Sequence, residues 1–143
     1  EHNKITELNR FLFSKLKKVN IIKLANNQIT LLDNQLDDLN ELKHIFLDKN
    51  PLIIFNFVQI DILKLHISNT RINFKNSLLF KNLNSLVDLD LSFNKINSEI
   101  LFDLNITKFK NLKRIILINN CLTSNDSIKF LDKFPLLEEI DLS

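Results

Sequence analysis

The chain has no glycine, tryptophan, tyrosine or methionine, and only two prolines and one cysteine among its 143 residues. Without glycine, it cannot form the glycine-rich loops that cradle phosphate groups in nucleotide-binding domains. The single Cys121 excludes an internal disulfide and a cysteine-built zinc site within this chain. Neither a cofactor nor a metal is therefore expected.

Long apolar runs and an excess of one charge are also missing. No apolar run reaches membrane-spanning length, and no signal or transit peptide opens the chain, so we expect no membrane insertion within this segment. The 19 basic and 17 acidic residues leave a net charge of only +2. This balance argues against a nucleic-acid-binding protein. Hydrophobic residues make up 45% of the chain, enough for a continuous core in one domain.

What the chain does have is a repeated spacing of apolar residues and asparagine. In residues 86–96, apolar side chains occupy positions 1, 4, 6 and 11 of the repeat, and Asn94 occupies position 9. The same spacing recurs from Val19 to Ile29, Leu42 to Leu52, Ile62 to Ile72 and Leu112 to Leu122, with Thr70 in place of asparagine in one copy. Partial copies stand at both ends. We therefore expect about six repeats in a single domain, residues 1–143, that begins and ends within a repeat and is an internal portion of a longer protein.

This pattern resembles the leucine-rich repeat, L-x-x-L-x-L-x-x-N-x-L. The first repeat continues with Leu8, Phe13 and Leu16, which is similar to the animal-type class of about 24 residues. The resemblance implies an α/β solenoid, a curved arc with one short strand per repeat and a parallel sheet on its concave face. A helix is also expected over residues 126–133, with Ser124 or Asn125 as its N-cap and Pro135 behind it.

Elementary geometry explains the repeated spacing. Positions 4 and 6 are two residues apart, so both side chains lie on one face of a strand and turn inward. Asparagine at position 9 can bond the backbone of the turn with its donors and its acceptor. Thr70 can supply only part of that bonding, so its repeat is expected to be the weakest. The segments between strands supply the remaining core residues: Leu8, Phe13, Leu16, Leu32, Leu39, Phe80, Leu83, Phe109, Leu131 and Phe134.

Positions 3, 5, 7 and 8 are expected to point out of the sheet, toward the concave side. Early strands place basic residues there and later strands place acids, while some apolar side chains are expected to stay exposed. Exposed apolar residues ringed by charge are typical of protein interfaces. The predicted partner-binding residues are Phe46, His66, Asp88, Asp90, Phe93, Arg114, Ile116 and Ile118.

The sequence supports a catalytic or metal site less well than a protein-binding face. His66 lies one strand from Asp88 and Asp90, with Ser68 and Ser92 nearby, which suggests a hydrolytic triad or a metal site. A triad also needs an oxyanion hole and a pocket, and a metal needs further ligands. We therefore expect a cross-strand charge pair and no enzymatic activity.

The resemblance implies a non-enzymatic recognition or scaffold module that binds a protein partner. A secreted or cell-surface receptor of the innate-immunity kind is favoured. The alternatives are an intracellular adaptor or regulatory subunit, of the phosphatase-regulator, tubulin-chaperone or ciliary type, and the targeting region of a larger enzyme. Two N-x-S/T sequences, at Asn105 and Asn125, are candidate glycosylation sites that are compatible with secretion.

Overall fold

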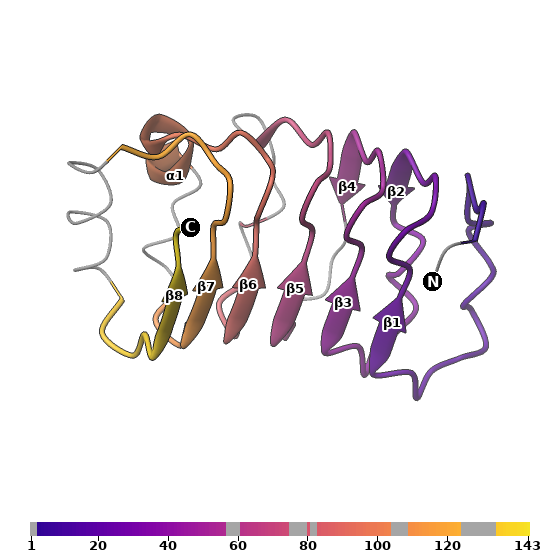
Figure 1. Ribbon diagram of the computed structural model, residues 1–143. Coiled ribbons are helices and arrows are strands. Elements are labelled where there is room, and N and C mark those ends of the chain that lie inside the picture. Colours follow the sequence, from indigo (N-terminus) through magenta and orange to yellow (C-terminus); the bar gives the residue numbers. More distant parts are fainter. Residues whose placement is uncertain (1–2, 57–60, 75–79, 81–82, 104–108, 124–133) are drawn as a thin grey trace.

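The protein is a solenoid whose successive coils stack along one axis (Figure 1). The computed structural model describes residues 3–56, 61–74, 80, 83–103, 109–123 and 134–143. Six short parallel strands form the principal sheet, in the order β1-β3-β5-β6-β7-β8. Their bounds are Ile21–Lys23, His44–Phe46, Lys64–His66, Asp88–Asp90, Arg114–Ile116 and Glu139–Asp141. The solenoid and its parallel sheet agree with the fold expected from the repeat.

The central residue of each strand pairs in register with the central residue of the next. Ile22 stands opposite Ile45, Ile45 opposite Leu65, and Leu65 opposite Leu89. Leu89 and Ile115 continue the row, and Ile45, Leu65, Leu89 and Ile115 are fully buried. Leu47, Ile67, Leu91 and Leu117, two residues later, form a second buried row, which Leu24 begins as a partly buried member. Both inward rows predicted from positions 4 and 6 are therefore present.

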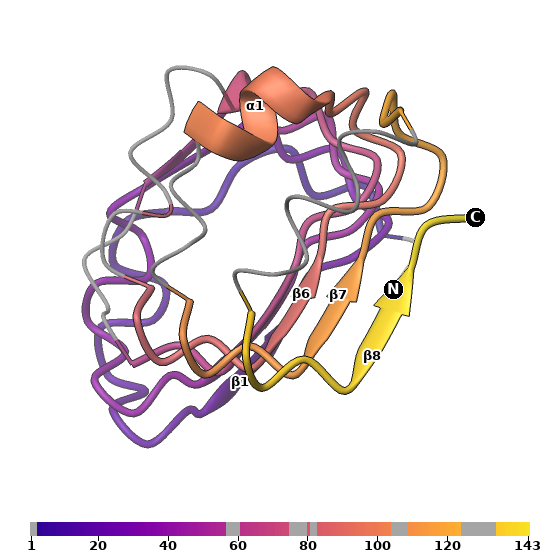
Figure 2. The ribbon, with the colours of Figure 1, turned by 90° about the vertical axis from the view of Figure 1, so that its left-hand side faces the viewer.

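The side of each coil away from the sheet varies along the molecule. The chain forms β2 (Leu31–Asp33) after β1, and β4 (Ile54–Asn56) after β3. These two strands pair in a small parallel sheet. After β6 it forms the short helix α1 (Ser98–Asp103). The Asn97 side chain caps this helix by accepting a hydrogen bond from the backbone N–H of Ile100 at 3.0 Å. Seen along the axis, α1 lies across the coil from the principal sheet (Figure 2). The helix predicted over residues 126–133 lies outside the described residues.

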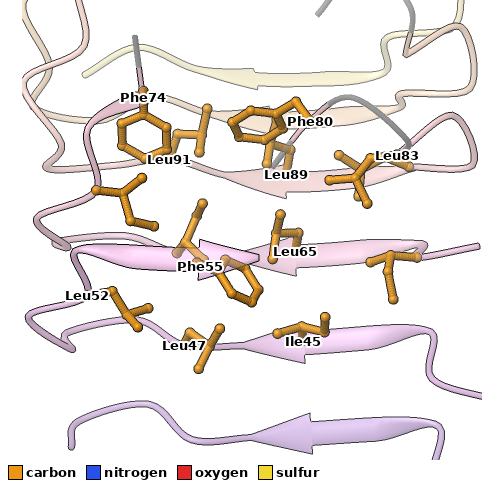
Figure 3. Packing of buried hydrophobic residues seen from close by; sticks show 14 of the residues in the cluster. Ile45, Leu47, Leu52, Phe55, Leu65, Phe74, Phe80, Leu83, Leu89 and Leu91 are labelled. Atoms are coloured by element: carbon orange, nitrogen blue, oxygen red, sulfur yellow. The ribbon is translucent and has the colours of Figure 1, made fainter. Parts of the chain in front are cut away.

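The core fills the space between the two sides of each coil (Figure 3). Phe80 lies between Phe74 and Phe109, with ring centroids 6.1 Å and 5.8 Å apart. Most of the predicted core residues from the return segments are buried, namely Leu8, Leu32, Leu39, Phe80, Leu83, Phe109 and Phe134. Phe13 packs against the cluster and Leu131 lies outside the described residues. The expectation for Leu16 was wrong: it is 47% exposed, because it lies in the first described coil, where only one side is covered by a neighbouring coil.

Asparagine at position 9 joins neighbouring coils. The Asn50 side chain is fully buried, and its amide donates to the carbonyls of Leu24 and Leu47, both at 2.9 Å. Its oxygen accepts from the backbone N–H of Ile29 at 3.0 Å. Asn120 repeats this pattern, with donation to Leu91 and Leu117. These side chains satisfy buried backbone groups of two coils at once, which agrees with the predicted role of the motif asparagine.

Candidate protein-recognition face

The outward side of the principal sheet presents two rows of side chains, called here the strand face. The first residue of each strand forms one row: Ile21, His44, Lys64, Asp88, Arg114 and Glu139. The third residue forms the other: Lys23, Phe46, His66, Asp90, Ile116 and Asp141. The register of the sheet therefore brings every predicted strand residue onto one surface, as the alternation of a strand requires.

Asp88 is the centre of an ion-pair network on this face. Its carboxylate lies 3.2 Å from His66 Nε2, 3.2 Å from Arg114 Nη1 and 3.4 Å from Lys64 Nζ. Arg114 extends the network through its Nε, which lies 2.8 Å from Glu139 Oε2. Four neighbouring strands, β5 to β8, thus contribute to one continuous set of charges. The carboxylate of Asp88 is buried beneath these partners, which fix its orientation.

Burial and neighbouring charges shift the pKa values of three residues on the strand face. Burial alone raises the pKa of Asp88, but hydrogen bonds from His66 and Arg114 and their charges outweigh it and lower the pKa to about 2. Burial alone lowers the pKa of Arg114. Hydrogen bonds to Glu139 and Asp88 have the opposite and larger effect, so the pKa is raised overall. Burial and the nearby Lys64 lower the pKa of His44 against the opposing charge of Asp88. The carboxylate and guanidinium are therefore held ionised.

Aromatic contacts extend the ordered region toward the first strand. The Phe46 ring meets His66 edge-on, with centroids 4.8 Å apart and planes at 74°. Lys23 Nζ lies 5.7 Å from the centroid of the same ring. These contacts are within the range for aromatic pairs and cation–π interactions. Lys23, Phe46, His66 and Asp88 consequently form a connected series across four strands.

The serines after the strands make hydrogen bonds to nearby aspartates. Ser92 donates its hydroxyl to Asp90 Oδ1 at 2.6 Å and its backbone N–H to the same oxygen at 2.9 Å. Ser143 bonds Asp141 in the same way, and these bonds lower the pKa of Asp141. The Ser68 backbone N–H bonds Asp48. The Ser92 hydroxyl is thus bonded to Asp90, which is not the carboxylate that bonds His66. Within the described ranges, no three His, Cys, Asp or Glu residues are grouped for metal binding.

A left-handed backbone residue follows the strand in each of five coils. The φ angles are 57° at Asn26, 55° at Lys49, 50° at Asn69, 58° at Phe93 and 52° at Asn119. Asparagine tolerates this region, whereas a bulky residue such as phenylalanine is an outlier there. Sequence reasoning placed these residues on the outward side but missed their conformation. The sequence signal for this conformation is the asparagine directly before the motif position, at Asn26, Asn69 and Asn119.

Phe93 protrudes from this position and is 49% exposed. Its backbone N–H donates to the carbonyl of Ile118 at 2.9 Å, and the Ile118 side chain is half-buried. Both residues line a pocket of about 440 Å³ that also reaches Leu142 and Ser143 at the end of the last strand. Two of the predicted apolar anchors therefore share one hollow.

The structure places seven of the eight predicted residues in three groups. His66 and Arg114 both bond Asp88, and Phe46 contacts His66. Phe93 and Ile118 share the pocket, and Asp90 accepts from Ser92.

The expectation that Ile116 is exposed was wrong. It is 8% exposed, and the register places it between Asp90 and Asp141 on the flanking strands. The candidate glycosylation sites Asn105 and Asn125 lie outside the described residues.

Comparisons with known proteins agree with this architecture. A family model described as "Leucine rich repeat" matches residues 1–52. An internalin (inlF) from Listeria monocytogenes superposes with a TM-score of 0.77 and 23% identity, covering 99% of this chain and 39% of that one. The TLR13–ssRNA13 complex gives 0.72 and 22% identity, covering 98% and 21%. A leucine-rich-repeat protein from Leptospira interrogans gives 0.57 and 23% identity, covering 99% and 41%. A search of curated protein sequences found no match.

The repeat, the parallel sheet and these likenesses define the fold: the chain has a solenoid fold like that of leucine-rich-repeat proteins, and the family model matches its first 52 of 143 residues. The chain spans about two fifths of the inlF internalin chain and about a fifth of the TLR13 chain. Among the described residues, no helix combines the length and apolar character that a membrane crossing demands.

Proposed function

We propose that the strand face, together with Phe93 and Ile118 in the turns that follow β6 and β7, binds a protein partner without catalysis, and that these two residues anchor the partner. The observation that carries this proposal is Phe93: a large aromatic side chain, 49% exposed, on a backbone with φ of 58°. Strained residues that persist on a surface cluster at functional sites, because the surrounding structure must hold them there at a cost in stability. An exposed aromatic ring beside a half-buried aliphatic residue is a frequent interface anchor.

The fixed charges beside the anchor support recognition. Lys64, Asp88, Arg114 and Glu139 are held by one another, so little side-chain freedom is lost when a partner covers them. Pre-organised charges give orientation and specificity more than raw affinity.

A protein partner fits this face better than a nucleic acid. Asp90, Glu139 and Asp141 lie on the later strands, and the Lys64 and Arg114 cations are paired with carboxylates. This arrangement repels phosphate or leaves few cations for it. The fold itself does not decide the question, since one similar structure is a complex with single-stranded RNA by its name.

Photo-crosslinking tests the proposal. A benzophenone amino acid replaces Phe93, or Ile53 as a control on the opposite side that is 57% exposed, in cells that produce the protein. We expect a discrete protein adduct at position 93 only, removed by excess unlabelled chain but not by a chain carrying Phe93→Ala and Ile118→Ala. Equal adducts at both positions, or equal competition by the double variant, would contradict a binding role for this face.

Within recognition proteins, the setting we propose is secreted or cell-surface, in the manner of an innate-immunity receptor, with an intracellular adaptor as the alternative. Mass spectrometry of Asn105 and Asn125 in protein from its native cells separates the two. Glycans at either residue support the exterior setting, and unmodified asparagine at both supports the adaptor.

A further inference from the structure

The left-handed residues that follow the principal strands form a regular row beside the strand face, called here the turn row. One residue from each of five coils belongs to it: Asn26, Lys49, Asn69, Phe93 and Asn119. Each backbone N–H in the row donates to a carbonyl of the next coil, at 2.8–2.9 Å. These turns follow the arrowheads of the principal strands in Figure 1. Because paired strands lie about 4.8 Å apart, the turn row presents its side chains at a fixed spacing.

Two members of the turn row, Lys49 and Phe93, depart from asparagine. Their φ angles are 55° and 58°, and both side chains are exposed. Neither has the short polar side chain with which asparagine lowers the cost of this conformation. Both lie in coils with a neighbour on each side, since β3 pairs with β1 and β5, and β6 pairs with β5 and β7. Their exposure therefore does not arise at an end of the chain.

Lys49 carries a charge that the described residues leave unpaired. It has no ion pair among them, in contrast to Lys64, which lies 3.4 Å from Asp88. The acid next to it in sequence, Asp48, accepts a hydrogen bond from the backbone N–H of Ser68 at 2.9 Å.

Asn69 lies between Lys49 and Phe93 in the turn row. Its side chain is exposed, and its amide bonds no other residue in the described part of the chain. An amide can both donate and accept, so it can bond the backbone of an extended peptide. The turn row therefore presents a cation, an amide and an aromatic ring in that order.

We propose that the turn row binds an extended segment of the partner in which an acidic side chain lies about three residues from an apolar one. This inference rests on the proposed function, because it assigns the chemistry of the segment that Phe93 anchors. Lys49 and Phe93 are two coils apart, about 10 Å, and an extended chain rises about 3.3 Å per residue. The carboxylate faces Lys49, the apolar side chain contacts Phe93, and Asn69 bonds the backbone between them.

A peptide fits the turn row better than a single-stranded nucleic acid does. A nucleic acid carries a phosphate on every nucleotide and needs several cations along its path. The turn row contains one cation, Lys49, and the Asp48 carboxylate is adjacent to it in sequence. One carboxylate of a peptide matches this single unpaired charge.

A library of short linear peptides displayed on phage tests this assignment. The chain is the bait, and the double variant Lys49→Asn with Phe93→Asn removes background binders, since asparagine occupies the same position in three other coils. We expect enriched peptides to carry Asp or Glu about three residues from an apolar residue, in either order. With one such synthetic peptide, Lys49→Asn should lower the affinity about three- to fivefold, and Phe93→Asn about tenfold or more.

Charge reversal separates a direct ion pair from a general effect. Lys49→Glu should weaken binding of the acidic peptide, and the same peptide with lysine in place of its acid should bind Lys49→Glu about as well as the acidic peptide binds the parent chain. Lys110→Glu is the matched control, an exposed lysine outside the turn row, and should bind the acidic peptide as the parent does. Urea denaturation should show Lys49→Asn to be at least as stable as the parent, so that lost binding is not lost folding.

Three results overturn the inference: no enrichment over the double variant, enriched peptides without an acid at this spacing, or no rescue by charge reversal. Binding of polyuridylic acid that is lost with the same two substitutions overturns it in favour of a nucleic acid. The crosslinking at position 93 is a separate measurement, so a partner adduct there would still support the proposed function if the peptide assignment failed.

Discussion

At the scale of single residues, Phe93 combines an exposed aromatic ring with a backbone conformation that lowers stability. Five coils need a left-handed residue after the strand, and three of them use asparagine. A left-handed backbone costs most residues about 1–2 kcal/mol, and asparagine lowers that cost through local hydrogen bonds. Phe93 has neither this advantage nor full burial, so local stability does not explain its presence.

Replacing Phe93 with asparagine therefore has opposite effects on two properties. We expect Phe93→Asn to raise the free energy of unfolding by about 0.5–1 kcal/mol, because the backbone strain falls and little apolar burial is lost. The same variant should lose the partner adduct at the strand face. Urea denaturation measures the first effect, and competition in the crosslinking assay measures the second. A less stable variant would mean that the ring contributes more to folding than its exposure indicates.

Asp88 gives a prediction about acid. Its pKa lies at about 2 in the folded chain, below the ordinary value of 3.8, so the ionised form stabilises the fold. This contribution, about 2 kcal/mol, is complete above pH 5 and is lost as the pH falls from about 4 to about 2. We expect the Asp88 carboxyl to titrate near pH 2 by NMR.

The companion measurement for Asp88 compares Asp88→Asn with Asp61→Asn in urea at pH 6 and pH 3. Asp88→Asn should destabilise less at the lower pH. Asp61 is largely exposed and 3.5 Å from Lys43, so its substitution should have little effect at either pH. An Asp88 midpoint at or above pH 4 would show that burial outweighs the cations around it.

At the scale of elements, the turn after each strand is the repeated unit, and Thr70 is its exception. The amide of Asn94 donates to Ile67 and Leu91, at 2.9 and 3.0 Å. Thr70 instead donates its hydroxyl to Asn94 Oδ1 at 2.9 Å. A hydroxyl has one proton to donate where an amide has two, so this turn has the smaller bonding capacity.

We expect Thr70→Asn to stabilise the chain by about 1 kcal/mol, since the new amide can donate to the carbonyls of Leu47 and Ile67, as Asn50 does to Leu24 and Leu47. The opposite change, Asn50→Ala, should cost about 1–3 kcal/mol by leaving buried carbonyls without a donor. Urea unfolding of both variants measures the difference. If Thr70→Asn destabilises as Asn50→Ala does, the bond from the Thr70 hydroxyl to Asn94 is required.

The principal strands could be predicted from the sequence because each one depends on its own alternation and on one spacing rule. The elements on the opposite side could not. Leu31-Leu32-Asp33 is too short to distinguish a strand from a loop, and β2 forms only because β4 lies beside it in the next coil. Ile116 was misjudged for a similar reason, since its neighbours in the sheet, Asp90 and Asp141, lie on other strands. Register predicted the contact of His66 with Asp88, but not the burial of the carboxylate.

At the scale of the whole molecule, the coils are coupled through their shared interior. Phe74 and Phe80 belong to one coil and Phe109 to the next, and their rings are in contact. Each coil contacts chiefly its neighbours, so stability is approximately a sum of coil and interface contributions.

Phe80→Ala should accordingly weaken two coils together. Removal of this buried ring should cost about 3–5 kcal/mol and leave a cavity between the coils. Hydrogen exchange should accelerate at the amides of both β5 and β6, including Leu65 and Leu89. Phe11→Ala is the control, because its 72% exposed ring should change stability by less than about 0.5 kcal/mol. Acceleration confined to one strand would argue against coupling through the aromatic rings.

The number of residues from one strand to its partner in the next coil varies, whereas the register of the paired strands does not. Paired residues are 23 apart from Ile21 to His44, 20 from His44 to Lys64, 24 from Lys64 to Asp88 and 26 from Asp88 to Arg114. Residues gained or lost on the far side of a coil thus leave the strand face in register. Over evolutionary time, such a molecule can accept insertions and deletions at its back while its front changes only by substitution, so the two sides can diversify independently.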